Sequence, residues 1–177
     1  EPAVVIGHSM GALVAQKLLE IATVPAVVLA CPVPPFGLLP SAFSLALFKP
    51  ALWNEINALA AGRSASREAL AAALFAGPIE ADGVERIYAR MQAESRRALM
   101  DMTWWGLPQL WRLDPPQTLV LGAARDALIS PALAESTARL LSAEYRLLDG
   151  LGHALMLDAR WERASEALFG WIEERGL

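Results

Sequence analysis

The chain contains few of the residue types from which disulfides and metal centres are built. Its 177 residues include a single cysteine, Cys31, which excludes an intrachain disulfide and fits a reducing compartment. Only two histidines occur, and no histidine pair or cysteine cluster has the spacing of a metal site. We therefore expect a cytoplasmic protein without a metal ion or an organic cofactor.

Long hydrophobic runs and clusters of positive charge are absent as well. Although 55% of the residues are hydrophobic, proline, glycine or charge interrupts each apolar stretch well before the roughly 20 residues of a membrane span. The net charge is −4 without any basic cluster, which argues against nucleic acid and anionic membranes as partners. The composition favours one compact globular domain with a substantial core.

The most informative motif lies near the start of the chain. The pentapeptide Gly-His-Ser-Met-Gly at residues 7–11 follows the apolar run of residues 3–6 and precedes a segment of helical character, residues 12–21. A serine between glycines at a tight strand-to-helix turn is typical of a nucleophile elbow, where we expect both glycines to prevent collisions. The first N–H groups of the helix lack intrahelical acceptors, so the backbone N–H of Met10 is a candidate oxyanion donor.

Strand and helix patterns alternate on either side of a long central segment. Residues 26–30 form a second apolar run without alternation, which is typical of a strand covered on both faces. Strand, helix and strand in succession form a βαβ unit with parallel strands and a right-handed crossover. Further strands are expected at residues 118–122 and 145–148, so the predicted fold class is α/β, with a parallel sheet flanked by helices.

Three helices are expected to cover this sheet. The helix after the elbow carries Val14, Leu18 and Ile21 at helical spacing, and we expect this face to be buried. Ser130 is a typical N-cap, because it is followed by a proline at the first helical position. The last helix, residues 158–175, is predicted to pack five side chains against the sheet: Trp161, Ala164, Leu168, Trp171 and Ile172.

Residues 32–113 have a different pattern. We interpret this segment as a helical cap inserted into a core domain that comprises residues 1–31 and 114–177. Proline and glycine separate its short predicted helices, and no convincing strand occurs among them. The predicted helices span residues 41–47, 50–61, 66–75, 83–91 and 95–105.

Three residues at strand ends have the types and the order of a catalytic triad. A serine hydroxyl is a weak nucleophile, so Ser9 needs a base, and the base needs an acid that orients it. His8 is a poor base for Ser9, because neighbouring side chains point apart within the elbow. His153 follows the last strand in a glycine-flanked loop, and Asp126 follows the preceding strand. Since the carboxyl ends of parallel strands meet at one sheet edge, we expect nucleophile, acid and base to lie together there.

Other carboxylates are alternatives for the acid. Asp149 and Asp158 both lie close to the predicted base in sequence, but Asp149 directly ends a strand and Asp158 opens the last helix. Asp101 and Asp114 lie in or beside the cap and are weaker candidates. We therefore favour the carboxylate in the loop after residues 118–122.

Three stretches of the chain resemble the α/β-hydrolase superfamily of serine esterases and lipases. They are the elbow at residues 7–11, Gly-Ala-Ala-Arg-Asp at residues 122–126 and Gly-Leu-Gly-His at residues 150–153, in the family's order of nucleophile, acid and histidine. The resemblance covers residues 1–32 and 118–177. It implies that the inserted segment is the cap or lid, which also resembles those of bacterial lipase-like and lysophospholipase-like hydrolases.

The chain departs from the family's pattern at its start. In that family the first strands, and a loop that carries a second oxyanion donor, precede the elbow. Here the chain begins at Glu1 and enters the elbow strand within two residues. We expect the N-terminal part of the same fold to be a partner of this chain, because the elbow strand would otherwise be an exposed sheet edge and the oxyanion hole would be incomplete.

The resemblance also implies a reaction. A serine nucleophile predicts hydrolysis of a carboxylic ester through an acyl-enzyme and argues against haloalkane dehalogenase and epoxide hydrolase chemistry. Trp104, Trp105 and Leu128 are candidates for binding an apolar acyl group or small lipid-like substrate, with packing in the protein core as the alternative role. Lactonase, thioesterase, perhydrolase, carbon–carbon hydrolase and acyltransferase reactions stay open, as does an inactive member that only binds a ligand.

Overall fold

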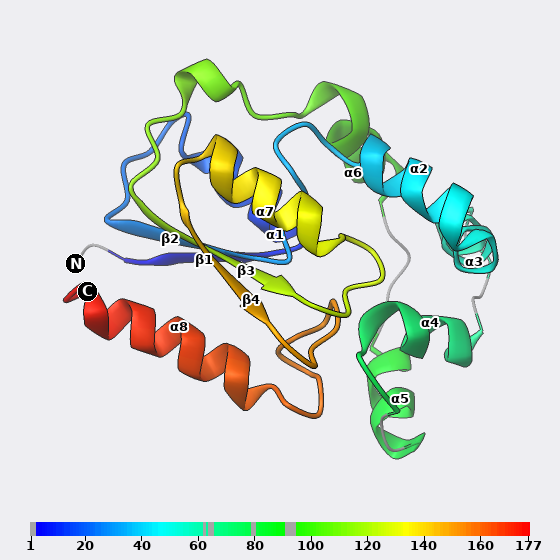
Figure 1. Cartoon of the computed structure of the whole chain (residues 1–177). Coiled ribbons are helices and arrows are strands. Elements are labelled where there is room, and N and C mark those ends of the chain that lie inside the picture. Colours follow the sequence, from blue (N-terminus) through cyan, green and yellow to red (C-terminus); the bar gives the residue numbers. More distant parts are fainter. Residues whose placement is uncertain (1–2, 62, 64–65, 79–80, 91–94) are drawn as a thin grey trace.

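The computed structural model describes residues 3–61, 63, 66–78, 81–90 and 95–177 (Figure 1). Within them, one sheet contains four parallel strands in the order β1-β2-β3-β4. The strands are β1 (Val5–His8), β2 (Ala26–Ala30), β3 (Gln117–Ala123) and β4 (Glu144–Leu148). The predicted α/β fold class with a parallel sheet is thus confirmed.

The strand register brings the carboxyl ends of the strands to one edge of the sheet. His8 at the end of β1 is paired with Ala30 at the end of β2, and Ala123 at the end of β3 is paired with Leu148 at the end of β4. Because all four strands are parallel, the loop that follows each strand begins at this edge of the sheet. The three loops that carry the predicted triad leave β1, β3 and β4 at this edge.

Helices cover both faces of the sheet. On one face lie α1 (Met10–Leu18) and α7 (Pro131–Leu140), and on the opposite face lies α8 (Glu162–Glu174) (Figure 1). Successive strand residues point to opposite faces, so each strand contributes to both cores. In β2, Val27 and Leu29 pack with α1 and α7, whereas Val28 packs with Trp171 of α8.

The face of α1 that packs on the sheet differs from the predicted one. Val14 is 63% exposed and Ile21, beyond the helix end, is 81% exposed. The buried residues are Ala12, Leu13, Ala15 and Gln16. The cause is the tight turn at Ser9, which brings the backbone of α1 so close to β1 that small side chains must face the sheet.

The last helix and the N-cap of α7 also differ from the prediction. In α8, Ala164 and Trp171 are buried as expected, but Trp161 precedes the first helical turn and is 49% exposed. Ser130 occupies the N-cap position of α7 with an extended backbone, yet its side chain makes no capping hydrogen bond. Proline at the following position removes one of the N–H groups that would otherwise need an acceptor.

Within its described residues, the segment between β2 and β3 contains helices joined by loops and no strand, and most of its helices lie beyond the edge at which the strands end (Figure 1). The predicted helix end at Met91 lies outside the described residues. The helices are α2 (Leu39–Phe48), α3 (Pro50–Ala60), α4 (Arg67–Leu74), α5 (Ala81–Tyr88) and α6 (Arg96–Met100), followed by a π-helical turn (Asp101–Trp105) and a 3-10 turn (Leu110–Arg112).

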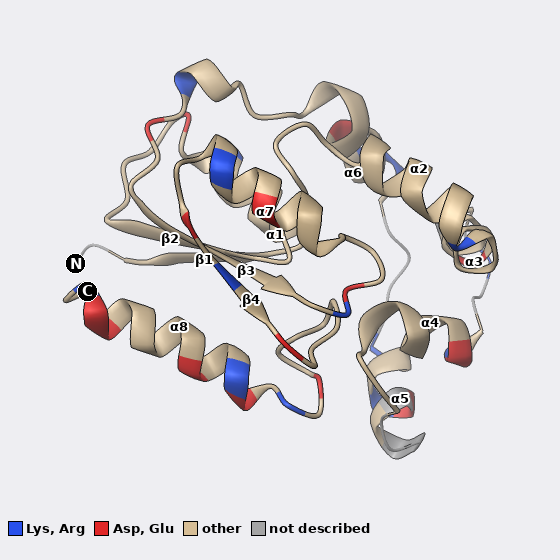
Figure 2. Ribbon diagram, viewed as in Figure 1, with Lys and Arg blue, Asp and Glu red and all other residues tan. Residues whose placement is uncertain are grey.

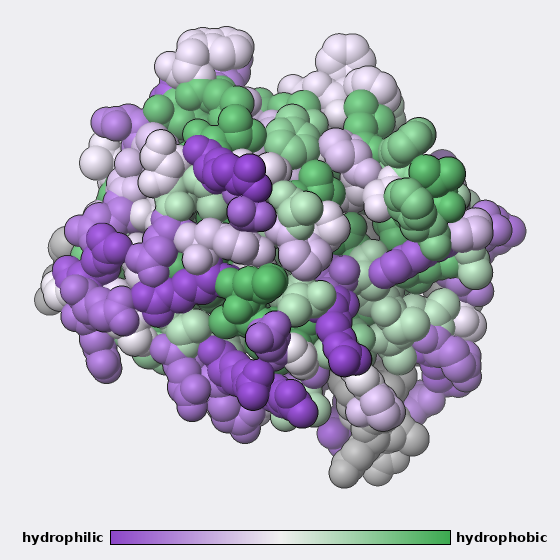
Figure 3. Space-filling view, viewed as in Figure 1, coloured by the Kyte–Doolittle hydropathy of each residue, from purple (hydrophilic) through white to green (hydrophobic). Residues whose placement is uncertain are grey.

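The surface is mixed in character. Lys and Arg are interspersed with Asp and Glu along the chain (Figure 2). Hydrophilic side chains gather over α8, whereas hydrophobic ones gather over α2, where Phe43 and Phe48 are 71% and 74% exposed (Figure 3). None of the described helices combines the length and the apolar character that crossing a membrane requires.

Candidate active site

Ser9 occupies the tight turn between β1 and α1. Its φ of 53° and ψ of −116° lie in a region that costs a residue with a side chain about 1–3 kcal/mol. Backbone hydrogen bonds hold this conformation. The Ser9 N–H donates to Ala30 O at 2.9 Å, and Ser9 O accepts from the N–H groups of Ala12 and Val33 at 3.1 and 3.2 Å. The neighbouring strand β2 and the start of α1 thus hold the serine at the sheet edge.

The two glycines of the elbow have different roles. A Cβ at Gly7 would lie 2.6 Å from Gly11 O and 2.7–2.8 Å from the backbone of Ala12. A Cβ at Gly11 would meet no atom within 4 Å. The prediction that both flanking positions must lack side chains is therefore wrong for Gly11. Only Gly7, in β1, lies directly against the backbone of α1.

The structure brings Ser9, His153 and Asp126 into one hydrogen-bonded chain. His153 Nε2 lies 2.9 Å from Ser9 Oγ, and His153 Nδ1 lies 2.8 Å from Asp126 Oδ2. A carboxylate can only accept, so Nδ1–H donates to Asp126, which leaves Nε2 as the acceptor for the serine hydroxyl. His153 is 4% exposed and Asp126 is 8% exposed, so little water competes for these bonds. This arrangement can remove the proton from Ser9 Oγ.

Backbone donors hold Asp126 in place. Its second oxygen, Oδ1, accepts hydrogen bonds from the N–H groups of Leu128 and Ile129, both at 2.8 Å. Its Oδ2 is thereby directed at His153. Of the alternative acids, Asp149 is exposed, and Asp158 accepts hydrogen bonds from backbone N–H groups instead of from the histidine.

His8 has a contact that sequence reasoning missed. Its Nε2 lies 2.8 Å from His153 O, to which it donates, and the centroids of the two rings are 5.0 Å apart. Burial lowers the pKa of His8 below its ordinary value, and the hydrogen bond to the His153 carbonyl opposes this shift only in part. No spacing pattern could have revealed a bond between residues 145 positions apart.

The fold also brings together three potential metal ligands that lie far apart in the sequence. The ligand atoms of His8, Cys31 and His153 lie within 4.8 Å of one another. Both ring nitrogens of His153 already bind Ser9 and Asp126. Burial, followed by the charge of Asp126, raises the pKa of the Cys31 thiol well above its ordinary value. Since a metal needs a thiolate and a free imidazole nitrogen, we assign no metal to this cluster.

The remaining predicted site residues lie in three places. Met10 is the first residue of α1, so its N–H has no acceptor one turn earlier in the helix. Leu128 is partly buried, packs against the apolar cluster that contains Leu13 and Val33, and donates its N–H to Asp126. Trp104 and Trp105 lie in the π-helical turn and are 58% and 79% exposed.

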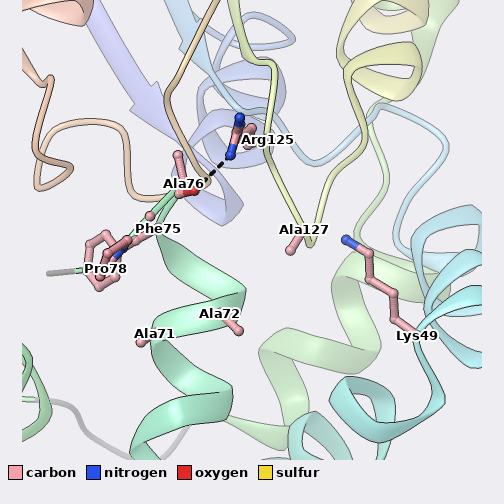
Figure 4. A pocket seen from close by; sticks show the side chains of 9 residues that line it. Lys49, Ala71, Ala72, Phe75, Ala76, Pro78, Arg125 and Ala127 are labelled. Carbon is pink, nitrogen blue, oxygen red and sulfur yellow. Dashed lines mark hydrogen bonds between the residues drawn. The ribbon is translucent and has the colours of Figure 1, made fainter.

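A pocket of about 430 Å³ lies between the helical segment and the loop after β3 (Figure 4). Phe75 and Ala76 form one wall, and Arg125 and Ala127, on either side of the acid in sequence, form another. The Arg125 guanidinium reaches across and donates to Ala76 O at 3.5 Å (Figure 4). The Lys49 side chain lines the far side.

Comparison with known protein families identifies the family of this chain. The sequence model of the alpha/beta hydrolase family matches residues 1–167. The chain belongs to the alpha/beta hydrolase family. The resemblance expected from the three motifs is thereby confirmed. A comparison with curated proteins gave no match.

Solved structures share the fold of this alpha/beta hydrolase. An esterase from Exiguobacterium antarcticum is 15% identical with a TM-score of 0.69, and the match covers 95% of this chain and 65% of the esterase. A bromoperoxidase from Bacillus anthracis is 18% identical with a TM-score of 0.69, with coverage of 96% and 67%. A serine hydrolase from Cycloclasticus zankles is 19% identical with a TM-score of 0.61, with coverage of 98% and 64%. The alpha/beta hydrolase chain thus spans about two thirds of the length of these structures.

Proposed function

We propose that this alpha/beta hydrolase cleaves carboxylic esters through an acyl-enzyme on Ser9. The observation that carries the proposal is the continuous chain from Ser9 Oγ through His153 to Asp126, with bonds of 2.9 and 2.8 Å. Each of the three side chains comes from a loop at the carboxyl edge of the sheet. The strained backbone of Ser9 further supports a functional role, since such conformations cluster at active sites.

In the proposed reaction each residue has one role. Ser9 Oγ attacks the ester carbonyl while its proton passes to His153 Nε2, and the resulting imidazolium is stabilised by Asp126. The C–O bond then breaks, and His153 gives the proton to the leaving alcohol. Water, deprotonated by the same histidine, hydrolyses the acyl-enzyme and regenerates Ser9. The N–H of Met10, at the positive end of α1, stabilises the oxyanion.

The substrate is proposed to carry an apolar acyl group or to be a small lipid-like ester. The helical segment, which we propose as the cap, contributes Met102 and Leu38 to an apolar cluster that also contains Leu13 of α1. Trp104, Trp105 and Leu128 are the proposed contacts with the substrate. The presence of an esterase among the structural neighbours agrees with this choice. Lactones, thioesters and peracids would use the same nucleophile and base, so a substrate panel includes them. Because the chain spans about two thirds of the length of the neighbours, the activity is proposed for the whole natural protein.

The decisive experiment compares two alanine variants of the natural protein. A fluorophosphonate probe and p-nitrophenyl esters of increasing chain length are applied to wild type, Ser9→Ala and Ser165→Ala. Ser165 lies in α8, on the sheet face opposite α1, and serves as the matched control. We expect Ser9→Ala to lose labelling and to lower turnover by about 10⁴-fold or more, with Ser165→Ala unchanged.

Two outcomes would contradict the proposal. Labelling and turnover that survive in Ser9→Ala would show that another residue is the nucleophile. A folded wild type that neither reacts with the probe nor cleaves any ester of the panel would instead favour a member of the family that only binds a ligand.

A further inference from the structure

The loop that carries His153 is in direct backbone contact with the end of α4. The Ala154 N–H donates to Leu74 O at 2.8 Å, and in Figure 1 α4 lies beside the loop between β4 and α8. A Cβ on Gly152 would lie 2.6–2.7 Å from backbone atoms of residues 74–76. The two segments therefore touch without an intervening side chain, although they are far apart in sequence.

One buried carboxylate joins these two segments. Asp158 Oδ2 accepts hydrogen bonds from the N–H of Ala76 at 2.8 Å and from the N–H of Gly152 at 3.0 Å. Its other oxygen, Oδ1, accepts from the N–H of Ala159 at 2.8 Å. Asp158 is 4% exposed, so water does not replace these bonds easily. The residue that the sequence offered as an alternative acid or as a helix start is thus a bridge.

The bridge needs a carboxylate because it faces donors alone. Two acceptor oxygens serve three backbone N–H groups, and bonds to an ionised acceptor are stronger than neutral ones. An asparagine has one acceptor oxygen and an NH₂ group that would point at backbone donors. Replacing Asp158 by asparagine therefore breaks either the bridge or the bond to Ala159, with almost no change in side-chain volume.

The bridged segment also lines the pocket. Ala76 forms part of the pocket wall, and its carbonyl accepts the hydrogen bond from Arg125, the residue before the acid (Figure 4). Arg125 N–H in turn donates to Leu151 O at 3.0 Å, within the histidine loop. Hydrogen bonds thus connect the pocket wall at Ala76, the loop that carries Asp126 and the loop that carries His153. Asp158 joins the pocket wall to the His153 loop.

We propose that Asp158 is a positioning residue for the hydrolysis, which holds the His153 loop against the pocket wall at residues 74–76. The inference rests on the proposed function, because it acts through His153. The bond of 2.9 Å between His153 Nε2 and Ser9 Oγ depends on where this loop lies. A displacement of about 1 Å in a catalytic group can lower the rate about 100-fold.

The test compares Asp158→Asn with Asp149→Asn in the natural protein. Asp149 is exposed, lies in the same connection between β4 and α8 and loses the same charge on substitution. Active sites are titrated with the fluorophosphonate probe, and kcat per titrated site is measured with a short p-nitrophenyl ester. We expect kcat per site to fall about 10- to 100-fold in Asp158→Asn and to stay within about twofold in Asp149→Asn. Hydrogen exchange should accelerate at residues 74–78 and 150–155 in Asp158→Asn alone.

A second variant keeps the test decisive if Asp158→Asn does not fold. Ala76→Pro replaces the N–H on the wall side of the bridge by a ring carbon that meets Asp158 Oδ2, and Phe75 before it already has the extended backbone that precedes proline, with φ −120° and ψ 152°. A similar fall in kcat per site is expected. Folded variants of either kind with wild-type kcat per site would overturn the inference, as would wild-type Ala76 and Gly152 amides that exchange without protection. A wild type without esterase activity or labelling would instead refute the proposed function.

Discussion

Alanine substitutions at Gly7 and Gly11 test whether the two glycines of the elbow have different roles. The structure indicates that only Gly7 must lack a side chain. At Gly7 the added Cβ meets Gly11 O and the Ala12 backbone at 2.6–2.8 Å, and backbone atoms cannot rotate away. Overpacking usually costs 1–3 kcal/mol, and three backbone contacts place Gly7→Ala at about 3 kcal/mol or more. For a chain of 177 residues this corresponds to a fall in Tm of about 6–12 °C.

Gly11→Ala is the matched control, with the opposite expected sign. Its Cβ enters open space within α1, where alanine is favoured over glycine by about 0.5–1 kcal/mol. Thermal unfolding and the rate of fluorophosphonate labelling measure both variants. We expect Gly7→Ala to label about 100-fold more slowly, because α1 and Ser9 shift relative to His153, and Gly11→Ala to label at the wild-type rate. The reasoning is refuted if Gly7→Ala keeps the wild-type Tm and labelling rate, or if Gly11→Ala is destabilised as much.

Two further predictions concern buried titratable groups near Ser9. Because burial lowers the pKa of His8, the unfolded chain binds a proton there at a higher pH than the folded chain, so stability is complete above the ordinary value of 6.5 and is lost as the pH falls below it. Urea unfolding of His8→Asn between about pH 5 and pH 7 should show a weaker pH dependence than wild type, and an equal dependence would contradict this account. Burial and the charge of Asp126 raise the pKa of the Cys31 thiol, so iodoacetamide at about pH 8 should modify it only after unfolding in urea. Stoichiometric alkylation of the folded protein would refute this prediction.

Much of the fold follows from local sequence. Apolar runs without alternation, separated by a helical segment, admit few arrangements besides a parallel sheet, because strands buried on both faces need helices on both sides. The sequence did not predict correctly which face of α1 packs on the sheet. Val14 is exposed because Ala12 and Ala15 are the residues of α1 that face the sheet, and Ile21 is exposed beyond the end of α1 at Leu18.

The sequence by itself determined which residues reach the carboxyl edge of the sheet. Ser9, Asp126 and His153 follow strand ends in that order, and a parallel sheet carries all such ends to one side whatever the details of packing. Only the tertiary structure decided how these residues are held. The bond from His8 to His153 O and the bridge at Asp158 join segments that no periodicity relates. Both depend on the path of the backbone through space, because their acceptors or donors are main-chain groups that every residue type supplies alike.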